Sequence, residues 1–475
     1  MQSKYDILQE NEQDPQNVSQ EMAQLLENFL SPLLMILDRL LDKRLLRTLV
    51  QCCVAIIRFR NNKQGLWLSE LGSYMDGYTG LSANAPAGTK RIGNLLRSIK
   101  WNVSHIDAYL LEEADKEVKR LKEQGKRIFC IWDGSVIEKP ESQASEGLCP
   151  VTSSKAKRLS RSKKGLVFNM PAARPIMVAG MHWTGALIAG MEGVPKVALM
   201  SWWTTRGDYA TRTREKEEEL LRICIKKWSD ILIHIFDRGY SSGPWIQFLQ
   251  SLRIQFIIRW KKGHFFIDRN GQTKKLWQIG LGKKYLAHKL IHDVHTGEKM
   301  PCDIWWAPVR HTMYSYQLYV VKVRVKKKVW YLITNEEVKT ETQAWDIFFA
   351  YRRRWQIETS FRYGKCELAM ESPRVWMMEN RLKLLSIVTL VYAFLLHLLE
   401  PLYREIVQSI LRLKCHRTGK RYQEALVPLY RLRWAICRLW NDNCPALGSV
   451  FPPNLETFQV LASFKKQNLL QKNSG

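Results

Sequence analysis

The sequence is poor in acidic residues and lacks the cysteine patterns of zinc-binding domains. Its 475 residues include 45 Asp and Glu against 73 Lys and Arg, a formal net charge of +28. The ten cysteines form no CxxC pair and no Cys/His ligand spacing, so a structural zinc site is not expected. Such an excess of positive charge is typical of proteins that bind a polyanion, most simply nucleic acid, with a membrane surface as the alternative.

The first residues also lack the basic and apolar regions of a secretory signal, since MQSKYDILQENEQDPQ is polar and acidic. A cytoplasmic protein with reduced thiols is therefore expected. The most apolar run, residues 384–403, contains His397 and Glu400 and follows basic helical sequence. We expect a buried helix there and no membrane partner. A hydrophobic content of 46% indicates a globular protein rather than a disordered one.

One basic stretch, YRRRWQIETSFRYGK at 351–365, has helical periodicity, no proline and a single late glycine. On a helical wheel, five of its polar residues fall within about 80° of one another. These residues are Tyr351, Arg354, Glu358, Arg362 and Lys365. The stripe is either a solvated charged face or a phosphate site, in which the carboxylate holds a metal and the other groups bind phosphate oxygens.

The spacing Tyr-x2-Arg-x3-Glu-x6-Lys resembles the YREK signature of the insertion sequence 4 family of DDE transposases. Such an enzyme needs two upstream aspartates that each end a β-strand. Asp133 follows the apolar run IFCIW, and Asp237 follows ILIHIF. For each of them an ordinary turn aspartate is the alternative. The resemblance implies that Asp133, Asp237 and Glu358 form a catalytic triad.

The elements between 126 and 260 are expected in the order three strands, helix, strand, helix, strand. This order resembles an RNase H-like core, in which the strands that precede Asp133 and Asp237 are neighbours. Most of the 120 residues before Glu358 alternate as β-strands, and a β-rich insertion at this place is a feature of the family. The expected fold class is α/β, with an RNase H-like catalytic core interrupted by that insertion and flanked by helical regions. The expected segments are an N-terminal helical DNA-binding region (1–120), the first part of the core (121–260), the insertion (261–338), the glutamate helix (339–372) and a C-terminal helical region for dimerisation (373–475).

The resemblance implies a cut-and-paste reaction on double-stranded DNA, with terminal inverted repeats and target DNA as partners and a homodimer joining two ends. Three carboxylates suit two Mg²⁺ ions, with Mn²⁺ as a substitute, one activating water or a 3′-hydroxyl and one stabilising the leaving oxygen. Nicking, hairpin formation and strand transfer would follow at one site, in a bacterial cytoplasm near the nucleoid. An RNase H-fold nuclease without strand transfer and a domesticated protein that only binds DNA are the alternatives.

Two further residues match the family by distance. Arg259 lies as far after Asp237 as a DNA-contacting arginine of the family, with a surface ion pair as the alternative. Trp330 lies as far before Glu358 as a base-stacking tryptophan, which implies a platform for a flipped nucleotide. A core aromatic is the alternative, and Trp305 and Trp306 compete for the role. Tyr351, Arg354, Lys365 and Arg362 would bind the phosphate near that base.

The chain departs from the family pattern after Asp133, where Gly-Ser replaces a familiar Thr pair, and its N-terminal segment matches no family motif. Residues 1–20 are expected to be disordered and 22–60 helical. The helix TKRIGNLLRSIKW, with Thr89 as its N-cap, suggests a helix-turn-helix-like DNA reader in which Lys90 and Arg91 recognise transposon ends, or else a plain helical bundle. The basic loop 139–165 is expected to be mobile and close to phosphates.

Overall fold

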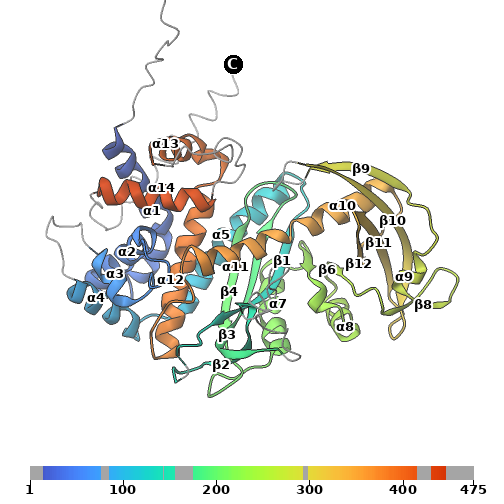
Figure 1. Ribbon diagram of the computed structural model, residues 1–475, viewed down its shortest axis with the longest axis horizontal. Helices are drawn as coiled ribbons and strands as arrows, with labels where there is room; N and C mark the ends of the chain where they lie inside the picture. Colours follow the sequence, from blue (N-terminus) through green and yellow to red (C-terminus); the bar gives the residue numbers. More distant parts are fainter. Residues whose placement is uncertain are drawn as a thin grey trace, which may run out of the picture. The chain divides into compact units, whose positions relative to one another are not determined.

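The computed structural model describes residues 14–75, 85–142, 144–155, 175–292, 298–414 and 429–445. The chain divides into two compact units. The first comprises Met1–Tyr109, Leu368–Val375 and Glu379–Gly475, and the second comprises Leu110–Glu367 and Trp376–Met378. The first is helical among its described residues, and the second contains the β-sheet (Figure 1).

The described helices of the first unit are α1 (Pro15–Leu37), α2 (Lys43–Arg58), α3 (Leu68–Ser73), α4 (Ala85–Arg97), most of α12 (Met378–His397), α13 (Arg404–Lys414) and α14 (Leu429–Asp442), with a short 3-10 turn at Pro401–Tyr403. Helix α5 (Val103–Glu123) begins in this unit, and its larger part belongs to the other.

Two sequence-based expectations for this unit are wrong. Helix α1 begins at Pro15, within the segment expected to be disordered, because Asp14 caps it by accepting from the Gln16 amide at 3.0 Å. Thr89 is not an N-cap, since it lies inside α4 and its hydroxyl donates to the Ala85 carbonyl at 2.7 Å. The loop before α4 and the basic part of the loop 139–165 fall mostly outside the described residues.

Helix α12 is the one described helix long and apolar enough to cross a membrane by length and composition. Its most apolar window is 78% buried inside the protein, as in the core helix of a folded domain. The expected buried helix is therefore observed.

The second unit is built on a 12-stranded mixed sheet with the order β2-β3-β1-β5-β6-β12-β11-β10-β7-β8, in which β4 also pairs with β3 and β9 with β10. Its core strands are β1 (Phe129–Glu138), β3 (Met177–Ala189), β4 (Lys196–Trp203), β5 (Ile233–Phe236) and β6 (Gln255–Arg259). Helix α7 (Thr213–Trp228) precedes β5, and α8 (Gly243–Ser251) precedes β6. Apart from the short extra strand β2 (Cys149–Thr152), these elements follow the order that the sequence predicts.

Strand pairing makes this part of the sheet mixed. Strand β3 pairs antiparallel with both β1 and β4, whereas β5 lies parallel to β1 on one side and to β6 on the other. The apolar runs of β1 and β5 are buried on both faces, which is why they carry little alternation.

The insertion contains β7 (Phe265–Ile267), β8 (Thr273–Lys275), β9 (Ala287–His292), β10 (Lys299–His311), β11 (Gln317–Val325) and β12 (Lys328–Thr334), with the short helix α9 (Leu276–Ile279). Figure 1 shows β9 to β12 side by side, and all their pairings are antiparallel. Strand β12 returns to pair with β6, so insertion and core share one sheet.

Three local predictions are wrong. Asp133 does not end its strand, because β1 continues to Glu138 through antiparallel pairing with β3. The loop after β1 contains a further short strand, β2 (Cys149–Thr152). The expected single glutamate helix is two helices, α10 (Glu341–Arg352) and α11 (Trp355–Cys366). Between them the amides of Arg353 and Arg354 bond three residues back rather than four, which tightens one turn.

Candidate active site

Strand register brings Asp133 and Asp237 to one level of the sheet. In the parallel pair, Ile131 of β1 lies opposite Ile235 of β5, and each aspartate is two residues further along its strand. Because residues two apart point to the same face, both carboxylates leave the sheet on the same side. Asp237 directly follows β5, as the sequence predicts, and accepts from the Gly239 amide at 2.6 Å.

Glu358 lies on α11, which packs against β1 and β3. A glycine permits this approach: Gly185 pairs with Asp133 in β3, and a Cβ there would meet Met200 Sδ at 2.8 Å and Phe361 at 3.3 Å. The Phe361 ring packs edge-on against Trp183, with 4.6 Å between centroids. The closely packed helix therefore presents Glu358 toward the level of Asp133.

Arg354 links two of the three carboxylates. One guanidinium nitrogen lies 2.9 Å from Asp133, and the other is paired with Glu358. The Arg354 side chain is only 12% exposed and that of Asp133 is 15% exposed, so these pairs are poorly screened by solvent. Arg354 thus links the catalytic candidates of β1 and α11.

The pKa values of Asp133 and Arg354 depend on burial and on the charged groups around them. Burial raises the pKa of Asp133 to about 7; Arg354 opposes this rise, while Asp237 and Glu358 add to it. Burial by itself would lower the pKa of Arg354, but Tyr351 and the two carboxylates raise it. The charges of Asp237 and Glu358 therefore reach Asp133.

The donor set suits a hard divalent cation, since all three side chains offer carboxylate oxygens. In the described part of the chain, no three His, Cys, Asp or Glu side chains stand close enough together to hold one ion. Arg354 lies between Asp133 and Glu358 and pairs with both. Metal ligation would require the guanidinium to move aside.

The remaining family-matched aromatic and basic residues meet beside this site. Arg259 pairs with Leu332 across β6 and β12, and its guanidinium lies 5.1 Å from the Trp330 ring centroid. The Trp330 ring is half-buried and meets Tyr351 edge-on at 5.9 Å. Burial raises the pKa of Tyr351. The structure therefore joins Arg259, Trp330 and Tyr351 into one cluster.

Trp305 and Trp306 lie elsewhere. Trp305 is buried in the hydrophobic core, and Trp306 is half-buried on β10. Arg362 is exposed on α11, with its guanidinium 5.8 Å from the Trp355 ring centroid. Its part in phosphate binding stays a prediction.

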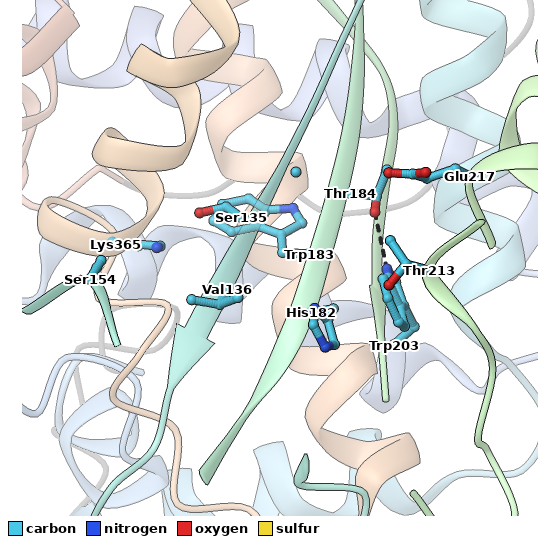
Figure 2. Close-up of a pocket in the computed structure, with 11 residues that line it drawn as sticks. Ser135, Val136, Ser154, His182, Trp183, Thr184, Trp203, Thr213, Glu217 and Lys365 are labelled. Atoms are coloured by element: carbon cyan, nitrogen blue, oxygen red, sulfur yellow. Dashed lines mark hydrogen bonds between the residues drawn. The ribbon is translucent and has the colours of Figure 1, made fainter. Parts of the chain in front are cut away.

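A pocket of about 370 Å³ lies against β1 and β3 (Figure 2). It is lined by Gly134, Ser135, Val136, Ser154, His182, Trp183, Thr184, Trp203, Thr213, Glu217 and Lys365. His182 and Trp203 stack with 4.2 Å between ring centroids, and the Trp203 indole donates to Thr184 at 3.0 Å. Lys365 of the expected phosphate site lines this pocket.

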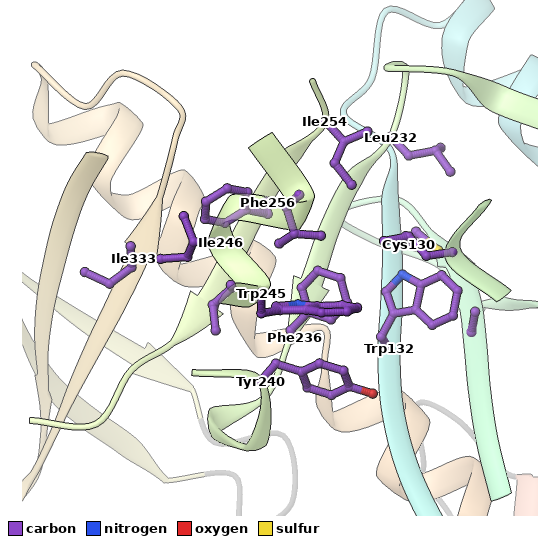
Figure 3. Close-up of a cluster of buried hydrophobic side chains, with 14 of the residues drawn as sticks. Cys130, Trp132, Leu232, Phe236, Tyr240, Trp245, Ile246, Ile254, Phe256 and Ile333 are labelled. Carbon is purple, nitrogen blue, oxygen red and sulfur yellow. The ribbon is translucent and has the colours of Figure 1, made fainter. Parts of the chain in front are cut away.

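The sequence did not identify Glu217, Arg214 and Tyr240 as site residues. Glu217 is buried and paired with Arg214 at 2.8 Å. The Arg214 guanidinium stacks on Trp245 at 4.6 Å and on Tyr240 at 5.3 Å. Tyr240 closes the 3-10 turn (Arg238–Tyr240) that Asp237 caps, and Figure 3 shows its ring among the aromatic side chains beside β5. These contacts brace the turn that carries Asp237.

The two expected end-recognition residues lie on α4 in the other unit. Lys90 is exposed, whereas Arg91 is half-buried and donates to the Gln51 side chain of α2 at 3.3 Å. Their role in end recognition stays a prediction.

Part of the chain is similar to a known protein family. Residues 210–392, which include Asp237 and Glu358, match the model of the transposase DDE domain. No curated protein matches the chain. A similar solved structure is a piggyBac transposase synaptic complex with hairpin DNA, at 11% identity and a TM-score of 0.38, covering 93% of this chain and 86% of that one. This region is thus similar to the transposase DDE domain, which indicates an enzyme that acts on DNA.

Proposed function

We propose that this protein is a cut-and-paste transposase of the insertion sequence 4 type, similar to the transposase of bacterial transposon 5, with an RNase H-like core. The observation that carries the proposal is the alignment of Asp133 and Asp237 on adjacent parallel strands, with Arg354 tying Asp133 to Glu358. The strand pairing around β1 and the β-rich insertion before Glu358 support it.

When bound by Asp133, Asp237 and Glu358, two Mg²⁺ ions, or Mn²⁺ in their place, would supply activation of the attacking oxygen and stabilisation of the leaving one. The chain's own residues position the DNA. Arg354 exchanges its carboxylate partners for a phosphate oxygen, which its planar fork fits as well as it fits carboxylates. Lys365 adds charge from the adjoining pocket.

The reaction in this proposal is a nick at the transposon end, attack of the new 3′-hydroxyl on the opposite strand to form a hairpin, hairpin opening, and strand transfer into target DNA. Each step is an in-line displacement at one phosphodiester. A homodimer would hold the two ends together.

The proposal is tested by incubating the protein with labelled DNA that carries the repeats flanking its own gene, with Mg²⁺ or with EDTA. We expect a metal-dependent nick at the repeat boundary and then a hairpin-sized product on denaturing gels. Cleavage without joining of the 3′ end to target DNA would favour the nuclease. Binding without cleavage in Mg²⁺ or Mn²⁺ would favour the non-catalytic protein.

Trp330→Ala is expected to nick at the normal rate but to form about tenfold less hairpin. Base stacking on an aromatic side chain is worth about 1–3 kcal/mol, and this half-buried ring has an arginine on one face and Tyr351 at its edge. Nick and hairpin yields are measured on one labelled end fragment. Trp277→Ala, which removes an exposed tryptophan of the insertion, is the matched control. A normal hairpin yield from Trp330→Ala would contradict the stacking role.

Glu217→Gln is expected to weaken metal-dependent cleavage about tenfold while the repeat is bound as before. The substitution removes the charge that orients Arg214 over Tyr240 and so loosens the turn of Asp237. Cleavage is measured across a Mg²⁺ titration, and the half-saturating concentration is expected to rise. Glu219→Gln, exposed on the same helix, is the control. An unchanged titration would show that the brace does not position Asp237.

A further inference from the structure

Helix α4 has an exposed polar face that is not part of the proposed catalytic site. Its exposed side includes Lys90, Asn94 and Arg97, which lie at i, i+4 and i+7 and therefore on one face. Its opposite side buries Ile92, Leu95 and Leu96. The helix is thus anchored by its apolar face and presents donors and acceptors outward.

The packing of α4 on α3 fixes the direction of this face. Gly72 of α3 and Gly88 of α4 meet backbone to backbone: a Cβ on Gly72 would lie 2.6 Å from the Ala85 carbonyl oxygen. The Thr89 hydroxyl also lies 3.1 Å from the Leu68 carbonyl oxygen, and Arg91 joins α4 to α2. Two short helices in close contact, the second with an exposed polar face, are the arrangement that places a helix in a DNA major groove.

The side chains on this face can form sequence-specific hydrogen bonds with DNA bases. Arginine pairs with the O6 and N7 atoms of guanine, and asparagine with the N6 and N7 atoms of adenine. Arg97 donates to the Asn94 side chain at 3.0 Å, and this bond is exposed, so base edges can replace it. Ile99, just beyond α4, is 93% exposed, and such an apolar side chain suits contact with a thymine methyl group.

We propose that α4 enters the major groove of the transposon end and that Asn94, Arg97 and Ile99 read its bases, while Lys90 contacts phosphate. The inference rests on the proposed function, because it assigns sequence recognition of the end DNA to these residues. Arg91 has a structural part in it, since its contact with Gln51 holds the reading helix on α2.

The test measures affinity for two duplexes of equal length in EDTA, where no cleavage occurs. One carries the repeat that flanks the gene, and the other is a scrambled version of it. Asn94→Ala and Arg97→Lys are compared with the wild type, since Arg97→Lys keeps the charge and the helix but loses the two-pronged donor. Arg47→Ala, an exposed cation of α2, is the matched control.

We expect each α4 variant to lower the ratio of repeat to scrambled affinity about tenfold or more, because a bidentate base contact discriminates by that amount. The affinity for scrambled DNA and the melting temperature should stay unchanged, and Arg47→Ala should keep the ratio. The inference is overturned if both α4 variants keep the wild-type ratio of repeat to scrambled affinity. A wild type without any preference for the repeat also overturns it, while metal-dependent cleavage, assayed separately, decides on the catalytic proposal.

Discussion

Glu358→Gln is expected to reduce strand cleavage at least about 1000-fold while leaving DNA affinity unchanged. Glutamine keeps the size of the side chain and can still accept from Arg354, so α11 should stay folded. It removes one of three negative charges, and the lost transition-state stabilisation corresponds to about 4 kcal/mol. Cleavage is measured on the labelled repeat fragment with saturating Mg²⁺, and binding by gel shift in EDTA.

Glu337→Gln provides the control for this experiment. Glu337 is exposed between β12 and α10 and is paired with Lys339 at 2.7 Å. Its loss should leave both readouts at the wild-type level. Cleavage by Glu358→Gln at the wild-type rate would remove Glu358 from the catalytic set and, with it, the basis of the proposed mechanism.

Arg354→Ala is expected to destabilise the metal-free protein and also to abolish cleavage. Removing the guanidinium leaves Asp133 and Glu358 as uncompensated, poorly solvated neighbours, which costs about 2–3 kcal/mol of unfolding free energy. We expect Mg²⁺ to restore much of this loss, because a cation that binds only the folded state stabilises it by mass action. The wild type should gain less, since its own guanidinium competes for the same carboxylates.

The measurement is the melting temperature over a Mg²⁺ titration without DNA, for the wild type and the variant. The half-saturating Mg²⁺ concentration should be lower for Arg354→Ala. Arg352→Ala is the control, because that guanidinium lies against Phe348 and donates to a backbone carbonyl rather than to a carboxylate. Equal stabilisation of wild type and variant by Mg²⁺ would contradict competition between Arg354 and the metal.

The sequence predicts a site residue correctly where that residue directly follows an apolar run that forms a strand. The run before Asp237 is closed by a polar turn, and β5 ends there. The strand of Asp133 behaves differently: Gly134 and Ser135 normally favour a turn, yet they extend β1 because β3 offers a long antiparallel partner. Such pairing depends on residues about 50 positions away and has no local signature.

Two other features depend on contacts between distant segments. The helix of the signature breaks before Arg354 without Pro or Gly, and Arg353 at the break donates to the Gly193 carbonyl at 2.6 Å. Glu217 lies in TREKEEELL, a pattern typical of a solvated helix, but α7 turns this glutamate toward Arg214 and the core. Charge patterns alone do not distinguish a solvated glutamate from one that braces a catalytic turn.

The pairing of Arg354 with Asp133 and Glu358 has a consequence for when this enzyme works. An enzyme that breaks DNA endangers the cell that makes it whenever it acts at random. In the proposed mechanism, Arg354 keeps the two carboxylates paired until two ligands bind together: a divalent ion for the carboxylates and a phosphate for the released guanidinium. Because neither ligand alone pairs every charge, we expect the enzyme to stay inactive until both the ion and the DNA are bound.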